Sequence, residues 1–87
     1  MAYDIRILPR SERELDDLPD LDFKRIDHTL QALRENPRPL GVKKLGGSLY
    51  RIRVGNGRVI FSIFDKEKHV VILRVARRSE KTYRGLK

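Results

Sequence analysis

Residues 50–61 read YRIRVGNGRVIF, and this stretch decides which fold the chain can adopt. Apolar and basic residues alternate before a Gly-Asn-Gly sequence, and an arginine followed by three apolar residues comes after it, a pattern typical of two strands joined by a tight turn. Because a strand repeats every two residues, Arg51 and Arg53 share one face and the apolar residues beside them share the other. We therefore predict a β-hairpin with an apolar face and an arginine-bearing face.

The register of this hairpin is decisive, because a slip of one residue would send every side chain to the opposite face. A three-residue loop would place Arg53 opposite Val59 and mix charge with the core. A four-residue loop or a bulged turn, to which the two glycines are suited, places Arg53 opposite Arg58 and Tyr50 opposite Phe61. We choose this second register because it separates the charged side chains from the apolar ones.

The composition describes a single domain spanning residues 1–87. The chain is 39% hydrophobic and 37% charged, and it has no cysteine, which excludes disulfides and thiolate metal sites. No stretch approaches the roughly 18 consecutive apolar residues that a membrane span needs, and the N-terminus lacks a signal-peptide pattern. We expect a cytoplasmic protein without a membrane partner.

Positive charge is concentrated in the second half of the chain. Residues 1–40 hold seven Lys/Arg against nine Asp/Glu, a balance of −2, and residues 41–87 hold thirteen against three, a balance of +10. Residues 36–64 contain no acidic side chain. This asymmetry indicates a polyanionic partner such as nucleic acid, with an acidic protein or simple solubility by repulsion as the alternatives.

Two helices are predicted before the hairpin. Ser11 and Glu14 form a capping-box pattern that predicts a short helix with Leu15 and Leu18 inward, ended by Pro19. A second helix is predicted over about residues 20–35. Apolar residues at helical spacing define its core-facing stripe, namely Phe23, Ile26, Leu30 and Leu33.

Strands are predicted over residues 3–8, 48–54, 58–64 and 69–77, followed by a helix over 80–86. In the last strand we expect Val71, Leu73 and Val75 in the core. The opposite face would then carry Ile72, Arg74, Ala76 and Arg78. The order βααβββα predicts an α+β fold: a small, mostly antiparallel sheet, two N-terminal helices packed on one face, and a short C-terminal helix.

The outward-facing arginines are the candidate functional residues. A guanidinium binds phosphate through a planar fork and stays charged at physiological pH, so several together would stabilise a phosphodiester whose charge rises in the transition state. RNA supplies its own nucleophile, the 2′-OH. Such a site then needs a base and help for the departing 5′-oxygen. The alternative is a solvated face whose long side chains splay apart.

Tyr83, on the predicted last helix, is the candidate base. Nearby cations favour the phenolate and lower the pKa of a phenol. The alternative is that Tyr83 only holds this helix on the sheet. His28 and His69 do not form a paired-histidine site, and no cluster of His, Asp and Glu indicates a metal, so we expect no metal and no other cofactor.

Several segments together resemble the RelE branch of the RelE/ParE toxin superfamily, over essentially the whole chain. They are VKKLGG at 42–47, YRIRVG at 50–55, RVIF at 58–61, VARR at 75–78 and Tyr83-Arg84. The resemblance implies a toxin of a type II toxin–antitoxin pair, an endoribonuclease that cuts mRNA in the ribosomal A site without a metal. Its implied partners are the ribosome, mRNA and a RelB-like antitoxin that wraps the toxin. The toxin alone would be monomeric, and hetero-oligomeric with its antitoxin.

The resemblance also implies residue roles. Arg51 and Arg53 match the basic positions of the family's Tyr-basic-apolar-basic strand and would hold the scissile phosphate. Arg58 matches the arginine after the hairpin and would clamp the same phosphate. Arg78 matches the arginine near the leaving oxygen, with Arg77 as the fallback.

Tyr83 matches the tyrosine assigned to activating the 2′-OH. Further contacts to RNA are expected from basic residues flanking these positions, namely Lys43, Lys44, Arg74, Arg77, Lys81 and Arg84. Two departures matter: some relatives have lysine at positions 51 and 53, and Gly57 stands where an aromatic residue is common. Arginine cannot readily exchange a proton, so Arg51 and Arg53 are expected to act electrostatically.

The ParE branch, whose members poison DNA gyrase without catalysis, shares the fold and is the alternative function. Gyrase poisoning has no chemical need for this set of arginines with a tyrosine, which is why the endoribonuclease is preferred. A third possibility is a degenerate toxin kept as an RNA- or antitoxin-binding module.

Overall fold

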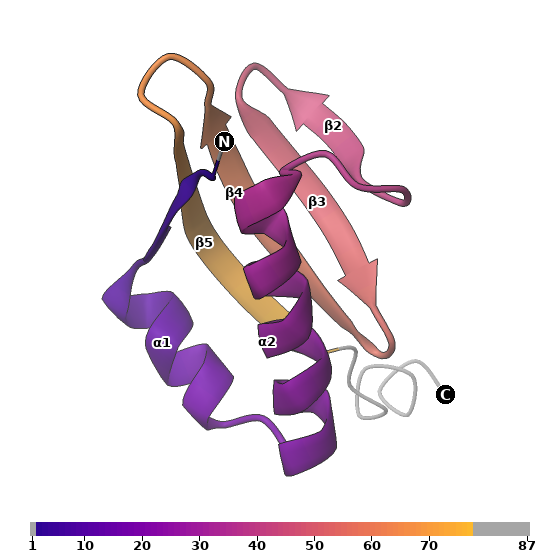
Figure 1. Ribbon diagram of the computed structural model, residues 1–87. Coiled ribbons are helices and arrows are strands. Elements are labelled where there is room, and N and C mark those ends of the chain that lie inside the picture. Colours follow the sequence, from indigo (N-terminus) through magenta and orange to yellow (C-terminus); the bar gives the residue numbers. More distant parts are fainter. Residues whose placement is uncertain (1, 78–87) are drawn as a thin grey trace.

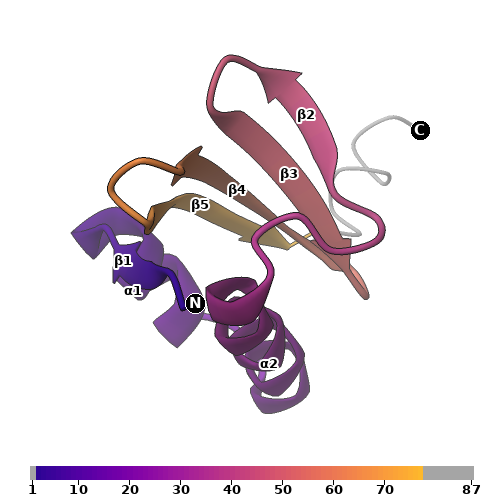
Figure 2. The same ribbon diagram turned by 45° about the horizontal axis from the view of Figure 1, so that its top comes forward.

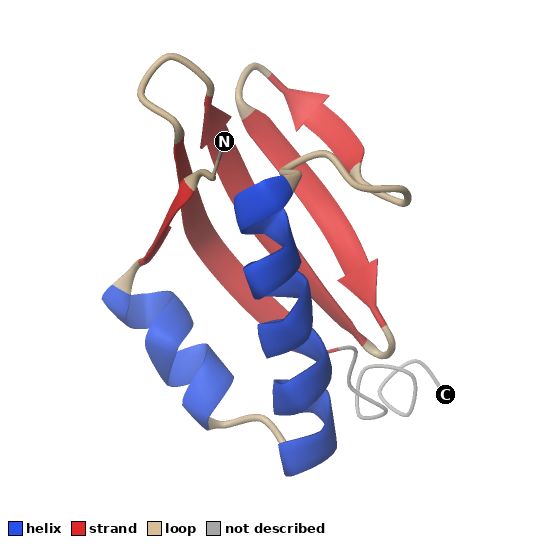
Figure 3. Ribbon diagram, in the orientation of Figure 1, coloured by secondary structure: helices blue, strands red, loops and turns tan. Residues whose placement is uncertain are grey.

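The computed structural model describes residues 2–77, which form two helices and a five-stranded sheet (Figure 1). In chain order the elements are β1 (Asp4–Ile7), α1 (Pro9–Asp16), α2 (Asp20–Glu35), β2 (Lys43–Gly46), β3 (Leu49–Val54), β4 (Gly57–Phe64) and β5 (His69–Arg77). The strand order across the sheet is β1-β5-β4-β3-β2 (Figure 3). Only β1 and β5 pair in parallel, so the predicted α+β class with a mostly antiparallel sheet is confirmed.

Both helices lie on one side of the sheet, and no described helix covers the other side (Figure 2). Ile26, Leu30 and Leu33 of α2 are buried, as their spacing predicts. The sheet contributes the inward-facing residues of its three long strands, namely Tyr50, Ile52, Val59, Phe61, Ile63, Val70, Ile72 and Val75. Burial of each such aliphatic or aromatic side chain stabilises the fold by about 1.5–3 kcal/mol, and this core fixes which face of the sheet stays open.

The register chosen for the β3–β4 hairpin is confirmed. Tyr50 pairs with Phe61, and Arg53 pairs with Arg58. Val54 pairs with Gly57, so the loop has two residues, Gly55 and Asn56, instead of the expected four-residue or bulged loop, and Gly55 adopts a positive φ of 57°. A β-carbon on Gly57 would lie 3.0 Å from Cδ1 of Ile26, so a small residue here lets α2 pack closely on the hairpin.

The prediction for the inward face of β5 is wrong in its first half. Val70 and Ile72 are fully buried, whereas Val71 and Leu73 are only half-buried. Ile60 of β4 pairs with Arg74 and the next residue, Phe61, pairs with Ile72, which leaves Leu73 as an extra residue in a β-bulge. Because the bulge shifts the alternation by one, Ile72 faces the core, and Arg74 and Ala76 still face outward as predicted.

The predicted capping box is also wrong. The first helix begins at Pro9 with Leu8 as its N-cap, so Ser11 and Glu14 lie inside it. Ser11 is buried, and its Oγ donates a hydrogen bond of 3.0 Å to the carbonyl oxygen of Ile72. An oxygen of the Glu14 carboxylate accepts a 2.8 Å hydrogen bond from the backbone N–H of Val75. Since β1 pairs with β5 only as far as Ile72, α1 uses these side chains to cover the edge of β5 that β1 leaves open.

Other differences concern the ends of elements. Phe23 is 38% exposed, because the first turn of α2 extends past the end of the sheet (Figure 1). Strand β2 was not predicted, since all four of its residues are exposed and carry no apolar alternation. The predicted helix over 80–86 lies outside the described residues. None of the helices within residues 2–77 is long and apolar enough to cross a membrane.

Candidate functional site: a basic sheet face

The open face of the sheet carries its basic side chains in two adjacent rows. One row contains Arg53 and Arg58, which pair directly across β3 and β4 and are both exposed. The next row contains Lys43, Arg51, Ile60 and Arg74, taken from four neighbouring strands. Cα atoms of directly opposed residues in antiparallel strands are about 4.5–5.5 Å apart, so these cations are close neighbours.

The charge on this face is uncompensated at its centre. Arg51, Arg53 and Arg58 form no ion pair with any residue in the described part of the chain. Directly opposed like charges destabilise a sheet, and a bound anion would remove that cost. The Nε of Arg51 is enclosed and has no hydrogen-bond partner within residues 2–77, which costs about a further 1–3 kcal/mol. A phosphate group fits this arrangement because several guanidinium forks could share its oxygens.

Arg74 and Arg77 differ from the central arginines. The Nε of Arg74 lies 3.1 Å from an oxygen of Glu14, so its charge is partly neutralised at the edge of the face. Arg77 pairs in register with the buried Gly57, which places it on the helix-facing side of the sheet. There its Nε lies 3.1 Å from an oxygen of Asp22 on α2. The structure therefore separates Arg77 from the outward-facing arginines.

Lys44 also lies apart, because it pairs with Tyr50 and so shares the helix-facing side, whereas Lys43 pairs with Arg51. Four of the residues predicted for the site lie outside the described residues, namely Arg78, Lys81, Tyr83 and Arg84. The roles assigned to them rest on the sequence. Within residues 2–77 there is no group of three or more His, Asp or Glu side chains that could hold a metal ion.

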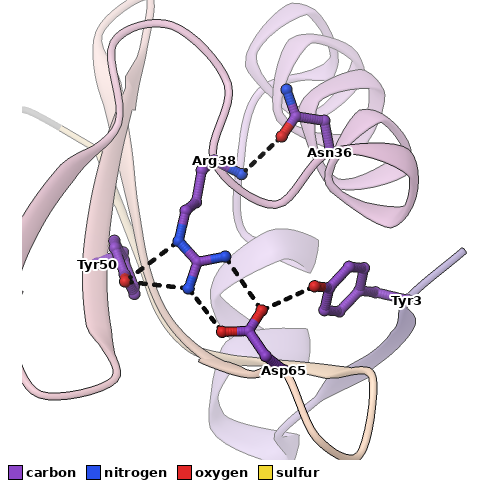
Figure 4. A network of polar contacts seen from close by, with 5 residues as sticks. All are labelled: Tyr3, Asn36, Arg38, Tyr50 and Asp65. Atoms are coloured by element: carbon purple, nitrogen blue, oxygen red, sulfur yellow. Dashed lines mark hydrogen bonds and ion pairs between the residues drawn. The ribbon is translucent and has the colours of Figure 1, made fainter. Parts of the chain in front are cut away.

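A second polar cluster was not predicted from the sequence (Figure 4). Arg38, in the loop between α2 and β2, donates two hydrogen bonds to the Asp65 carboxylate, from Nη1 at 3.1 Å and from Nη2 at 2.9 Å. Its Nε and Nη2 also lie 3.3 and 3.2 Å from the Tyr50 hydroxyl, and the Tyr3 hydroxyl donates a 2.7 Å hydrogen bond to Asp65. We call Tyr3, Arg38, Tyr50 and Asp65 the Arg38 network.

The network shifts the titration of its charged members. Hydrogen bonds from Arg38, and then from Tyr3, lower the pKa of Asp65 to about 2. Hydrogen bonds to Asp65 and Tyr50 raise the pKa of Arg38. No sequence pattern indicated these contacts, because Arg38 is separated from Tyr50 by 12 residues and from Asp65 by 27. Such separations match no helix or strand period.

Comparisons with known proteins identify the family of this chain. A family model described as ParE toxin of type II toxin–antitoxin system, parDE, matches residues 5–82. A protein of Methanocaldococcus jannaschii assigned as the toxin RelE1 is 30% identical over 83 residues, which cover 90% of this chain and 92% of that protein. The chain belongs to the RelE/ParE superfamily of type II toxin–antitoxin toxins.

Solved structures of RelE toxins share the fold of this chain. The archaeal RelE–RelB complex from Pyrococcus horikoshii contains a chain that superposes with a TM-score of 0.83 and 32% identity, covering 91% of this chain and 98% of that one. The RelBE2 toxin–antitoxin complex from Mycobacterium tuberculosis gives a TM-score of 0.79 and 27% identity, covering 90% and 100%. The protein is thus a RelE-like toxin with the fold of these relatives.

Proposed function

We propose that this toxin is a ribosome-dependent endoribonuclease that cleaves mRNA in the A site by metal-independent attack of the 2′-OH. The observation that supports it best is the open row of Arg53 and Arg58, with Arg51 beside it, facing outward without an ion pair to a described residue. A face with this much unpaired positive charge is stabilised most by a ligand with a high density of negative charge. An RNA backbone is such a ligand.

The proposed reaction needs no group beyond RNA and the protein. The 2′-oxygen loses its proton to the base and attacks the adjacent phosphorus, the P–O5′ bond breaks, and the departing 5′-oxygen takes up a proton from water, so that the products are a 2′,3′-cyclic phosphate and a 5′-hydroxyl. Arg51, Arg53 and Arg58 would stabilise the phosphorane, whose negative charge exceeds that of the ground state. Tyr83 would accept the 2′-OH proton and Arg78 would lie near the departing 5′-oxygen, as their positions in the family motif suggest.

We further propose that a RelB-like antitoxin inhibits the protein by covering this basic face. RelE relatives have been solved in complex with RelB antitoxins, which supports a partner of that kind. The net charge of +8 favours an acidic partner and would also attract the free toxin to ribosomal RNA. The free toxin would act in the cytoplasm as a monomer, and the complex with its antitoxin would be hetero-oligomeric.

The direct test incubates the purified protein with programmed ribosomes and maps the 5′ ends of the mRNA. We expect new 5′ ends within the A-site codon. The matching family model is described as a ParE toxin, so a DNA gyrase supercoiling assay should run in parallel. Intact mRNA with blocked supercoiling would establish the gyrase-poisoning alternative, and no effect in either assay would indicate a degenerate binding module.

A further inference from the structure

Strand β2 is the least supported strand of the sheet. It has four residues, all exposed, and it pairs only with β3. Its Lys43 lies opposite Arg51, so this pairing brings two like charges together, which weakens it. A short edge strand with such a pair has little free energy of its own to hold it in place.

The Arg38 network supplies a polar attachment for the loop that leads into β2 (Figure 4). Arg38 lies in that loop, and its guanidinium bridges the Tyr50 hydroxyl on β3 and the Asp65 carboxylate in the β4–β5 turn. Tyr50 is also the residue with which Lys44 of β2 pairs. The same guanidinium therefore ties the loop that precedes β2, five residues before Lys43, to the strand against which β2 must pair.

We propose that Arg38, held by Asp65 and Tyr50, is a positioning residue that keeps β2 docked so that Lys43 extends the basic row of Arg51 toward the RNA. This proposal rests on the proposed function for its RNA ligand, but the docking itself does not. The Arg38–Asp65 pair is partly exposed, with 41% and 55% of the two side chains accessible. Exposed pairs contribute little as isolated contacts, but here the two-pronged geometry and the Tyr50 and Tyr3 contacts restrict the loop.

The test compares Asp65→Asn with Glu67→Gln, a matched control in the same turn. Both substitutions remove one negative charge, but Glu67 forms none of the ion pairs found within residues 2–77. In hydrogen exchange of the free protein, we expect backbone amides of β2 to exchange at least about 10-fold faster in Asp65→Asn, with α2 amides unchanged. Exchange of β2 should stay at the wild-type rate in Glu67→Gln.

The same variants distinguish positioning from direct contact in the mRNA cleavage assay. If Arg38 positions β2, Asp65→Asn should raise KM by at least about 5-fold with kcat within about 2-fold, although the protein has become more positive. If Arg38 instead binds RNA directly, freeing it from Asp65 should lower KM. A lowered KM, unchanged β2 exchange, or equal acceleration in β2 and α2 would each overturn the proposal. A wild-type protein that cleaves no mRNA would refute the proposed function, and the exchange rates of β2 would still decide the docking role.

Discussion

Arg53 and Arg58 face each other across two antiparallel strands, an arrangement that costs folding free energy unless an anion lies between or above them. Neither has an ion-pair partner among residues 2–77, although Arg74 and Arg77 on the neighbouring strand both do. Acidic residues of the helices thus neutralise the arginines at the margin and leave the central ones free. This distribution supports the phosphate-binding role that we propose for the central arginines.

At this scale we expect Arg53→Ala to lower the single-turnover rate of ribosomal mRNA cleavage by at least about 100-fold, the usual cost of removing one donor that stabilises a developing oxyanion. The matched control is Arg34→Ala, which removes the same charge from an exposed position on α2. The control should cleave within about 3-fold of wild type if net charge contributes only to encounter. Equal losses in both variants would argue for a general electrostatic effect.

Tyr83→Phe removes the hydroxyl that is proposed to accept the 2′-OH proton. We expect cleavage to slow by at least about 100-fold, the low end of a general acid–base contribution. Arg78→Ala should cause a loss of similar size. Binding of the toxin to ribosomes, measured separately, should be retained in Tyr83→Phe, and cleavage near the wild-type rate in both variants would remove these two assigned roles.

Among the secondary-structure elements, α1 covers part of the edge of β5, a role that its sequence pattern did not predict. Ser11 and Glu14 belong to one face of a short helix, yet each bonds the backbone of β5 rather than the start of its own helix. The helix therefore replaces a neighbouring strand beyond Ile72, where the pairing of β1 ends. Unpaired backbone groups at a sheet edge promote aggregation through pairing with another chain. Helix α1 covers such groups on β5.

Replacing Ser11 by alanine should lower the free energy of unfolding by about 1 kcal/mol, because the carbonyl oxygen of Ile72 loses a buried hydrogen bond. Chemical denaturation at neutral pH measures this difference. Ser48→Ala, at a half-buried position whose hydroxyl forms no hydrogen bond within residues 2–77, is the control and should change stability by less than about 0.5 kcal/mol. Identical stabilities of the two variants would show that the Ser11 contact contributes nothing.

Over the whole molecule, negative charge is concentrated in the helical layer and positive charge in the sheet. The helices and the segments that join them hold most of the acidic residues, and the strands hold the central arginines, so that residues 1–40 carry −2 and residues 41–87 carry +10. Arg74–Glu14 and Arg77–Asp22 link the two layers. The Arg38 network joins the loop that follows α2 to the β4–β5 turn (Figure 4).

The interaction of Asp65 with Arg38 leads us to a prediction about the stability of the protein in acid. The pKa of Asp65 is lowered from 3.8 to about 2 in the folded protein, so its ionised form is favoured by folding. Its contribution to stability is complete above the unfolded pKa near 4 and is lost as the pH falls through about 2. The difference in denaturation midpoint between wild type and Asp65→Asn should therefore shrink from pH 5 to pH 2. A difference that stays constant over this range would contradict the assigned pairing.

Local periodicity was enough to predict the β3–β4 hairpin, its register, the extent of α2 and the sharing of one sheet face by Arg51, Arg53 and Arg58. Each of these depends on residues within one or two turns or across one tight turn, where backbone geometry dictates which side chains share a face.

Tertiary structure alone decided the bulge at Leu73, the use of Ser11 and Glu14 by β5, and the Arg38 network. These features join residues as many as 62 positions apart in the chain, as Tyr3 and Asp65 are. Contacts at such separations form only when packing of the core has brought the elements together. They therefore cannot be predicted from a repeating pattern along the chain.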